Sequence, residues 1–343
     1  MKALVYMIFP ASVLIAVTAL LRILFLRQLP KRLFTALWLV AAIRLVIPSS
    51  LILPSGPNTP DAAMLIMGAA EQVRYRLANA AGLTTTPGPV QTRIFLSVWA
   101  VGAAALAGYF ILSHLRFLRR CQLALPAESP AIWAIAESFR LRRRVRILVS
   151  RWVSSPLTYG VLRPVILLPA GMEQAPEERL RCALVHEFVH IRRLHVPFKY
   201  LLAAVLCLYW FDPLVWLMYA LADRDIELVC DQEALHLLGG CRADYATALI
   251  QAEAERSAGV LLTGLGGRAV KERVRQILLA KNHGIAAAVL AVILLLCSAV
   301  SFLSTTEIVT EKDAVSPDVT PLPRAVSEGE LSPVSQSGQK GDL

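Results

Sequence analysis

The chain has 343 residues, of which 56% are hydrophobic, and its mean hydropathy is +0.56. These values exceed those of ordinary soluble domains and predict a mostly α-helical membrane protein. The formal net charge of +10 would also suit a nucleic-acid-binding protein. The sequence has no basic face interleaved with aromatic residues, so direct nucleic-acid binding is not expected.

Three apolar segments in the first third of the chain predict membrane-spanning helices. Residues 3–26 and 94–115 each contain a long uncharged run, enough to cross about 30 Å of hydrocarbon. Residues 33–54 form a weaker span because Arg44 interrupts it, and we expect this side chain to face protein or to reach toward a headgroup. The intervening segment, residues 55–92, is poor in charge and is predicted to be an external loop.

A fourth span is predicted at residues 283–304, and basic residues give the orientation. Lysine and arginine collect at residues 27–32, 116–120 and 271–281, next to the ends of the predicted spans. The positive-inside rule assigns these segments to the cytoplasm of a bacterial cell whose plasma membrane the chain crosses several times. The N-terminus and the tail, residues 305–343, are then external. The remaining positive charge is available to contact anionic membrane lipid.

Residues 118–282 are predicted to form a cytoplasmic domain that contains strands as well as helices. Apolar and β-branched runs at residues 145–149 and 156–169, punctuated by glycine and proline, predict two or three short strands. A strand at this position could be the edge along which an extended substrate pairs. A helix is predicted to begin near Pro176, with Glu177 and Glu178 at its positive end.

The most informative motif is the HExxH sequence of residues 186–190 in this helix. One helical turn separates His186 from His190, so both imidazoles can reach one Zn²⁺ from the same helix face. Glu187 lies beside them, where a carboxylate can act as a general base in peptide hydrolysis. Two histidines that merely pack on a charged helix would be the alternative.

A third metal ligand is expected downstream, where two acidic residues share a helix face. Glu227 and Asp231 lie four residues apart, so one can bind the metal while the other orients a ligand histidine. Asp231 is the natural candidate for the second role, because ligating histidines usually donate their other N–H to a carboxylate. Cys230 adjoins this face and a thiolate ligand is conceivable, although a buried thiol is the more common role.

The apolar segment 200–222 lies between the two halves of this predicted zinc site. A single membrane crossing there would separate His186 from Glu227, whereas one metal ion requires both within a few ångströms. Pro213 interrupts the segment, so we predict a helical hairpin. A shallow re-entrant hairpin and a hairpin in the core of a soluble domain both remain open.

With these motifs the chain resembles a known family, the integral-membrane zinc peptidases of the β-lactam sensor-transducers. The matching segments are residues 156–169, 186–193, 212–216 and 227–231, and the resemblance extends from residue 1 to about residue 305. It implies four spans and a cytoplasmic α+β gluzincin-type peptidase domain. It also implies zinc bound by His186, His190 and Glu227, with Glu187 as the general base.

The sequence departs from this family in two places. Family members usually carry an acidic residue five positions after the second histidine, and His195 stands there instead. The resistance sensors also continue into an external penicillin-binding domain. Residues 305–343 are rich in Ser, Pro, Glu, Gly and Asp and are expected to be disordered.

The predicted function is that of a membrane-bound zinc endopeptidase that cuts a regulatory protein or itself in the cytoplasm. A winged-helix transcriptional repressor is the expected kind of protein partner, and a homodimer is open. Candidates for a side chain that stabilises the transition state are His195, His236, Arg242 and Tyr245. Two alternatives remain: a non-catalytic signal transducer that uses the zinc domain as a scaffold, and a processing enzyme similar to the prenyl-protein membrane peptidases.

Overall fold

The computed structural model describes residues 2–26, 28–47, 76, 89–139, 143–239, 242–257, 266–279 and 293. These residues belong to one compact unit, Met1–Thr306. Most of them are helical, and four short strands form a small mixed sheet. The predicted fourth span and the tail, and most of the predicted external loop, lie outside the described residues.

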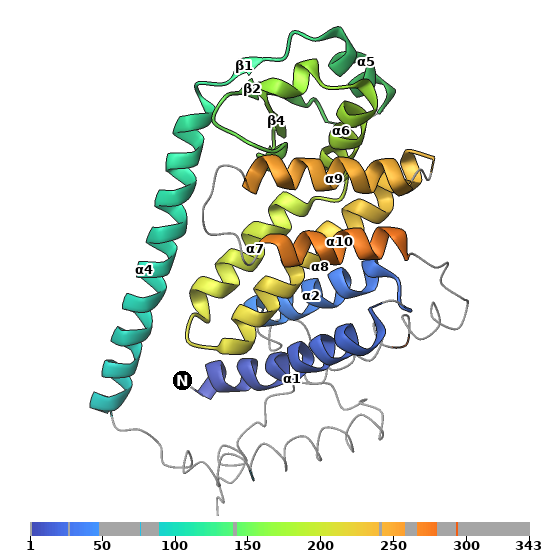
Figure 1. The fold of residues 1–343 in the computed structure, drawn as a ribbon. Coiled ribbons are helices and arrows are strands. Elements are labelled where there is room, and N and C mark those ends of the chain that lie inside the picture. The colour runs from blue at the N-terminus through green and yellow to red at the C-terminus, as the bar shows by residue number, and fades with distance from the viewer. Residues whose placement is uncertain are drawn as a thin grey trace, which may run out of the picture. The chain divides into compact units, whose positions relative to one another are not determined.

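Four helices pack into a bundle around the largest hydrophobic core. They are α1 (Lys2–Phe25), α2 (Lys31–Val46), α7 (His195–Leu208) and α8 (Pro213–Leu237). Their shared core contains large side chains with almost no solvent exposure, among them Phe34, Trp38 and Leu206. Figure 1 shows α2 lying between α1 and the α7–α8 pair.

Helix α2 covers the first part of the second predicted span, whereas residues 48–54 of that span lie outside the described residues. Helix α2 stops at Val46 and contains 16 residues, which corresponds to about 24 Å at 1.5 Å per residue. The next residue, Ile47, is extended, with φ −104° and ψ 115°. Its neighbour Pro48 explains this boundary, because a residue before proline is sterically excluded from the helical region. Arg44 is buried, as one of the two predicted environments requires.

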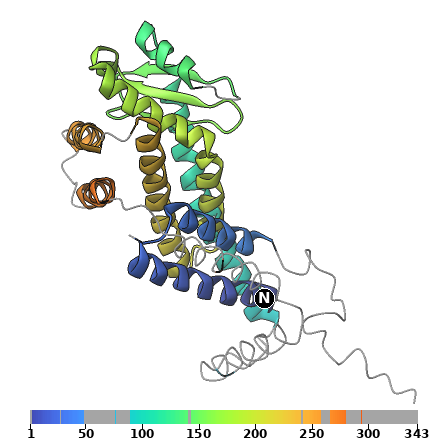
Figure 2. The ribbon, with the colours of Figure 1, turned by 90° about the vertical axis from the view of Figure 1, so that its right-hand side faces the viewer.

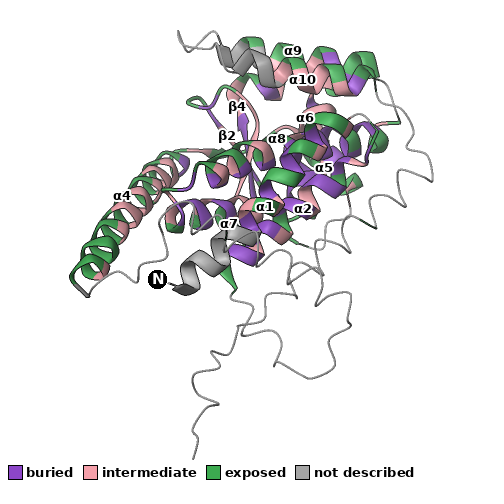
Figure 3. Cartoon of the chain, turned by 90° about the horizontal axis from the view of Figure 1, so that it is seen from below, coloured by how far each residue is buried: buried purple, intermediate pink, exposed green. Residues whose placement is uncertain are grey.

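One described helix is long and apolar enough to cross a membrane. It is α4 (Pro89–Cys121), whose most apolar 18-residue window has a mean hydropathy of 2.0 and contains no buried residue. Figure 3 shows α4 with mostly exposed and partly exposed residues, whereas the bundle helices are largely buried. Ala11–Phe25 and α7 are also apolar but shorter.

The side of α4 that is not exposed contacts the hairpin of α7 and α8. The indole N–H of Trp99 donates to the carbonyl of Leu208, and that of Trp210 donates to the carbonyl of Trp99. The Trp210 ring lies directly against Gly102, where an added Cβ would stand 2.2 Å from it. This glycine is therefore required for the close approach of α4 to the turn of the hairpin.

The sheet has the strand order β1-β2-β4-β3. Strands β2 (Arg146–Ser150) and β4 (Val165–Pro169) are parallel, while β1 (Leu125–Pro126) and β3 (Leu157–Tyr159) pair antiparallel at the two edges. Strands β3 and β4 lie within the predicted segment 156–169, and β2 coincides with the predicted segment 145–149 except for Ser150. Aromatic contacts connect the end of α4 to this region, with ring centroids 5.3 Å apart for Phe117 and Tyr159.

Helix α6 (Glu177–Arg192) covers one face of the sheet together with α5 (Pro130–Ser138). It follows the short 3-10 helix η2 (Ala170–Gln174) and begins directly after Pro176, as predicted. Leu184 and Phe188 of α6 pack on Ile166 and Leu168 of β4 in a second core. Helices α9 (Arg242–Ser257) and α10 (Gly266–Leu278) lie side by side, and Figure 2 views both nearly end-on next to α8.

Candidate metal centre

The two histidines of the HExxH motif lie on one face of α6, with their rings directed at each other. Their Nε2 atoms are 3.3 Å apart and the ring centroids are 5.0 Å apart. Phe188 and Leu184, on the opposite face, anchor the helix on the sheet, so the core packing of α6 orients both imidazoles away from the sheet.

Glu227 of α8 completes a three-ligand arrangement with these histidines. One carboxylate oxygen lies 3.4 Å from Nε2 of His186 and the other lies 3.7 Å from Nε2 of His190. Tetrahedral zinc with bonds of about 2.0–2.1 Å separates its nitrogen and oxygen ligands by roughly 3.3–3.4 Å. The two histidine nitrogens, 3.3 Å apart, match this separation, and each has one oxygen of Glu227 at 3.4 or 3.7 Å. The three side chains therefore converge on one point at which they could hold a zinc ion.

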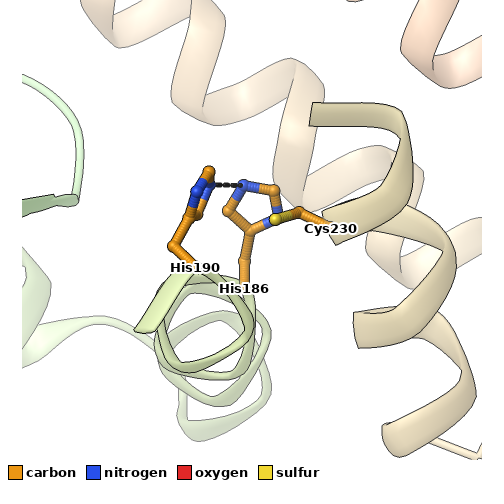
Figure 4. Close-up of side chains that lie close together, drawn as sticks. All are labelled: His186, His190 and Cys230. Atoms are coloured by element: carbon orange, nitrogen blue, oxygen red, sulfur yellow. Dashed lines mark hydrogen bonds between the residues drawn. The ribbon is translucent and has the colours of Figure 1, made fainter. Parts of the chain in front are cut away.

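Cys230 of α8 offers a second possible ligand set. One ligand atom each from His186, His190 and Cys230 lie within 4.8 Å of one another, as Figure 4 shows. The Cys230 side chain is fully buried, and burial raises the pKa of its thiol well above the ordinary value. Its Sγ atom lies 3.2 Å from Nδ1 of His195, whereas Glu227 faces Nε2 of both HExxH histidines, so the geometry favours Glu227.

Asp231 lies behind His186, on the side of the ring away from Glu227. Its Oδ1 atom is 3.4 Å from Nδ1 of His186 and accepts a hydrogen bond of 3.0 Å from the hydroxyl of Tyr245. Arg273 of α10 holds the same carboxylate through two contacts of 2.7 Å. Burial alone would raise the pKa of Asp231, but Arg273 and His186 outweigh it and lower the pKa to about 2. The carboxylate stays ionised and can fix the orientation of His186.

Glu187 lies at the edge strand β3. Its Oε2 atom accepts a hydrogen bond of 2.6 Å from the hydroxyl of Thr158 in that strand. The side chain is buried, and burial raises the pKa of its carboxyl, although His186 and Thr158 offset part of this increase. A carboxylate with a raised pKa is a stronger base at neutral pH than an exposed glutamate.

The electrostatics of the site balance the charge on Glu227. Lys199 of α7 lies 3.3 Å from one of its carboxylate oxygens, and Arg273 lies 3.5 Å from the other. Burial would raise the pKa of Glu227, but Lys199 and His190 lower it well below the ordinary value.

The two histidines differ in their pKa values. Burial would lower the pKa of His186, whereas its contacts with Asp231 and Glu227 raise it to about 9. Burial lowers the pKa of His190 well below its ordinary value.

These residues line a pocket of about 510 Å³ between α6, β3, α8, α9 and α10. Its walls also include small and apolar side chains, listed here: Pro156, Met172, Ala248, Leu249, Ala252 and Val270. The pocket places Glu187 and the three candidate ligands in a cavity large enough for part of a peptide chain.

The four candidates for transition-state stabilisation lie in different places. Tyr245 is buried, with its hydroxyl 2.9 Å from Nδ1 of His186, and His195 is buried beside Nδ1 of His190. Both therefore contact the ring nitrogens that face away from Glu227. His236 and Arg242 are exposed and lie outside the pocket lining.

Three residues of the site were not identified from the sequence: Thr158, Lys199 and Arg273. Thr158 lies in the apolar segment that was predicted to be an edge strand. It is a polar residue between Leu157 and Tyr159, and this pattern was the available signal. Arg273 lies in the basic stretch that was interpreted as marking the cytoplasmic side. No local pattern marks Lys199, which occurs within an apolar helix.

This arrangement is typical of a metallopeptidase centre. One helix carries the two histidines and the buried Glu187, and a second helix supplies the carboxylate of Glu227. Comparison with family models agrees with this class. Residues 2–277 match the family described as BlaR1 peptidase M56, and the chain belongs to that family.

The curated relatives are regulatory and resistance proteins. The chain is 30% identical over 148 residues to the regulatory protein BlaR1 of Bacillus licheniformis, which covers 42% of this chain and 25% of that protein. It is 24% identical over 98 residues to the methicillin resistance mecR1 proteins of Staphylococcus aureus and Staphylococcus epidermidis, covering 28% of this chain and 17% of each. The matched part thus spans a quarter or less of these relatives.

Proposed function

We propose that the protein is a zinc endopeptidase with His186, His190 and Glu227 as metal ligands. The observation that carries this proposal is the convergence of three side chains: the two histidine Nε2 atoms are 3.3 Å apart, and Glu227 places one oxygen 3.4 or 3.7 Å from each of them. When bound, zinc would polarise the scissile carbonyl and acidify a water molecule. Cys230 is assigned no ligand role.

Glu187 is proposed to be the general base. Its carboxylate takes a proton from the attacking water and passes this proton to the leaving amine. Thr158 donates a hydrogen bond to Oε2 of Glu187, so the other oxygen is the one available to accept the proton. The burial that raises the pKa of Glu187 favours both the uptake and the release of this proton near neutral pH.

The edge strand β3 is proposed to bind the substrate backbone. Within the described part of the chain, β3 pairs with β4 along one edge and with no strand along the other. Ser155, Pro156, Leu157 and Thr158 line the pocket, so an extended peptide paired with β3 would pass Glu187. Pairing through main-chain hydrogen bonds would hold a peptide without strict dependence on its side chains.

The proposed substrate is a cytoplasmic regulatory protein, for which a winged-helix repressor is the leading candidate, or the protein itself. The printed names of the relatives, a regulatory protein and methicillin resistance proteins, support a role in regulation. Membrane attachment through α4 and the other predicted spans would place the pocket at the cytoplasmic surface.

The test is Glu187→Gln in the full-length chain in detergent, with fluorophore-labelled denatured casein as the probe. This variant should keep zinc and lose casein cleavage, because it removes the base but no ligand. Glu178→Gln is the matched control, since Glu178 is exposed on the same helix. Cleavage at the wild-type rate by Glu187→Gln would reject the mechanism. Wild-type protein that holds zinc without cleaving casein or a winged-helix repressor would favour the non-catalytic transducer instead.

A further inference from the structure

Two buried side chains, those of His195 and Cys230, lie in series behind His190. Nδ1 of His190 is 3.3 Å from Nδ1 of His195, and the same nitrogen of His195 is 3.2 Å from Sγ of Cys230. The His190 and His195 rings meet edge to face, with centroids 5.2 Å apart. His195 is 3% exposed and Cys230 is fully buried, so water does not compete for these contacts.

The backbone between α6 and α7 is bent in a way that brings His195 to this position. Among the residues that the structure describes, Leu194 alone of the non-glycine residues has a positive φ, at 57°. This left-handed conformation is unfavourable for a leucine relative to the right-handed region. It ends α6 and turns the chain at once, so that His195 becomes the first residue of α7 and lies against His190.

The proton positions follow from the metal site. To bind zinc through Nε2, His190 must be a neutral imidazole whose single proton is on Nδ1. That N–H points at Nδ1 of His195, which must then be the unprotonated acceptor. The proton of His195 therefore sits on its Nε2 atom, and the Cys230 thiol is a second, weak donor to the same nitrogen.

We infer that His195 is a positioning residue for zinc ligand His190, through a neutral imidazole acceptor at the place of the carboxylate that usually occupies this position. This inference rests on the proposed zinc site. The two ligand histidines are then supported differently. His186 faces the charged carboxylate of Asp231, while His190 faces an uncharged ring and a thiol. Cys230 takes part through His195 and not as a ligand.

The experiment measures zinc affinity by chelator competition in the full-length chain, with three substitutions of His195. His195→Leu removes the acceptor and should weaken zinc binding by roughly 10–100-fold. His195→Asn should recover at least about tenfold of this loss, because its amide oxygen can occupy the Nδ1 position. His195→Gln is the matched control, because its longer side chain places the amide nearer the Nε2 position.

Replacement of zinc by Co²⁺ shows, through the visible spectrum, whether His195 or Cys230 is itself a metal ligand. The visible spectrum of the Co²⁺ protein should be the same in wild type and His195→Asn, because the ligand set is unchanged. Cys230→Ser should also keep it, without loss of a sulfur-to-metal band. A spectrum that changes in His195→Asn, or a sulfur band that disappears in Cys230→Ser, would make one of these residues a ligand and overturn the inference.

Failure of this inference can be told apart from failure of the proposed function. If wild type binds no zinc, or if His186→Ala binds it undiminished, the zinc site itself is wrong. If wild type binds zinc and His186→Ala does not, but His195→Leu binds as wild type does, His195 does not position His190. Equal affinities of the Asn and Gln variants would also contradict the role assigned to the Nδ1 acceptor.

Discussion

Arg22 of α1 and Asp225 of α8 form a buried ion pair across 203 positions of sequence, with Nε of the arginine 2.7 Å from Oδ1 of the aspartate. The indole of Trp38 donates to the other oxygen of Asp225, and Arg22 also contacts Glu272 of α10. Glu272 adjoins Arg273, which holds Asp231. The N-terminal helix α1 therefore contacts α8 and α10, the helices that carry Asp231 and Arg273 of the candidate metal site.

Breaking this pair should destabilise the whole bundle. Arg22→Leu leaves the Asp225 carboxylate buried without its cationic partner, and we expect a loss of roughly 3–5 kcal/mol in the free energy of unfolding. Arg22→Leu combined with Asp225→Leu should be markedly more stable than the single variant. The measurement is thermal unfolding in detergent, and a single variant as stable as wild type would contradict the burial of this pair.

Replacing Asp231 should weaken zinc binding without abolishing it. Asp231→Ala removes the group that orients His186, for which a loss of roughly 10–100-fold is expected, while Glu227→Ala removes a ligand and should be more severe. Gln232→Ala, exposed on the same helix, is the control. Zinc affinities measured by chelator competition that are unchanged in both acidic variants would mean that α8 does not supply the site.

Zinc binding should release a proton at neutral pH. In the metal-free protein the pKa of His186 is raised to about 9, so below that pH zinc must displace its proton. Zinc affinity should therefore fall by about tenfold per pH unit as the pH is lowered from 9 toward neutrality, and should level off above 9. His190 adds no proton in this range because burial lowers its pKa well below the ordinary value. Affinity independent of pH between about 7 and 9 would show that His186 is already neutral.

The predicted topology can be tested without a substrate. Reporters inserted after Arg193 and after Leu238 should both indicate the cytoplasm, since α6 and α8 contribute to one site. A reporter after residue 305 should indicate the outside, because residues 283–304 are predicted to cross the membrane. An external signal at Leu238 would separate Glu227 from the histidines and reject the site.

The contact between α4 and the hairpin can be tested at two glycines of the same helix. Gly102→Leu should clash with the Trp210 ring and destabilise the protein by roughly 1–3 kcal/mol. Gly108→Leu should have little effect, because an added Cβ there meets nothing within 4 Å. Thermal unfolding of both variants gives the comparison, and Trp210→Ala should rescue the first. Equal melting temperatures would argue that α4 does not lie against Trp210.

The sequence predicts the parts of this site that repeat at helical spacing. His186 and His190, and likewise Glu227 and Asp231, are four residues apart, so a helix alone brings each pair to one face. The requirement for a common metal ion then predicts that the two helices meet, and the structure brings these four residues together.

What spacing could not predict are the contacts from more distant elements. Arg273 has the same local surroundings as Lys271 and Arg275, and its position against Asp231 depends on where α10 docks. Thr158 contacts Glu187 because the sheet places β3 beside α6, which no pattern within either segment specifies. The end of α2 at Val46 agrees with the sequence, in which Pro48 follows Ile47.

Helix α4 contacts the rest of the described chain near both of its ends. Near its end, Phe117 packs on Tyr159, which follows Thr158 in the edge strand, and His114 packs on Tyr200 of α7. Nearer its start, Gly102 lies against Trp210 in the turn that leads into α8 and Glu227. Helix α4 therefore contacts both the edge strand β3, which carries Thr158, and the α7–α8 pair, which carries Glu227. If α4 crosses the membrane as predicted, a change in its tilt would act on both contacts at once, so bilayer thickness becomes a variable of the candidate site.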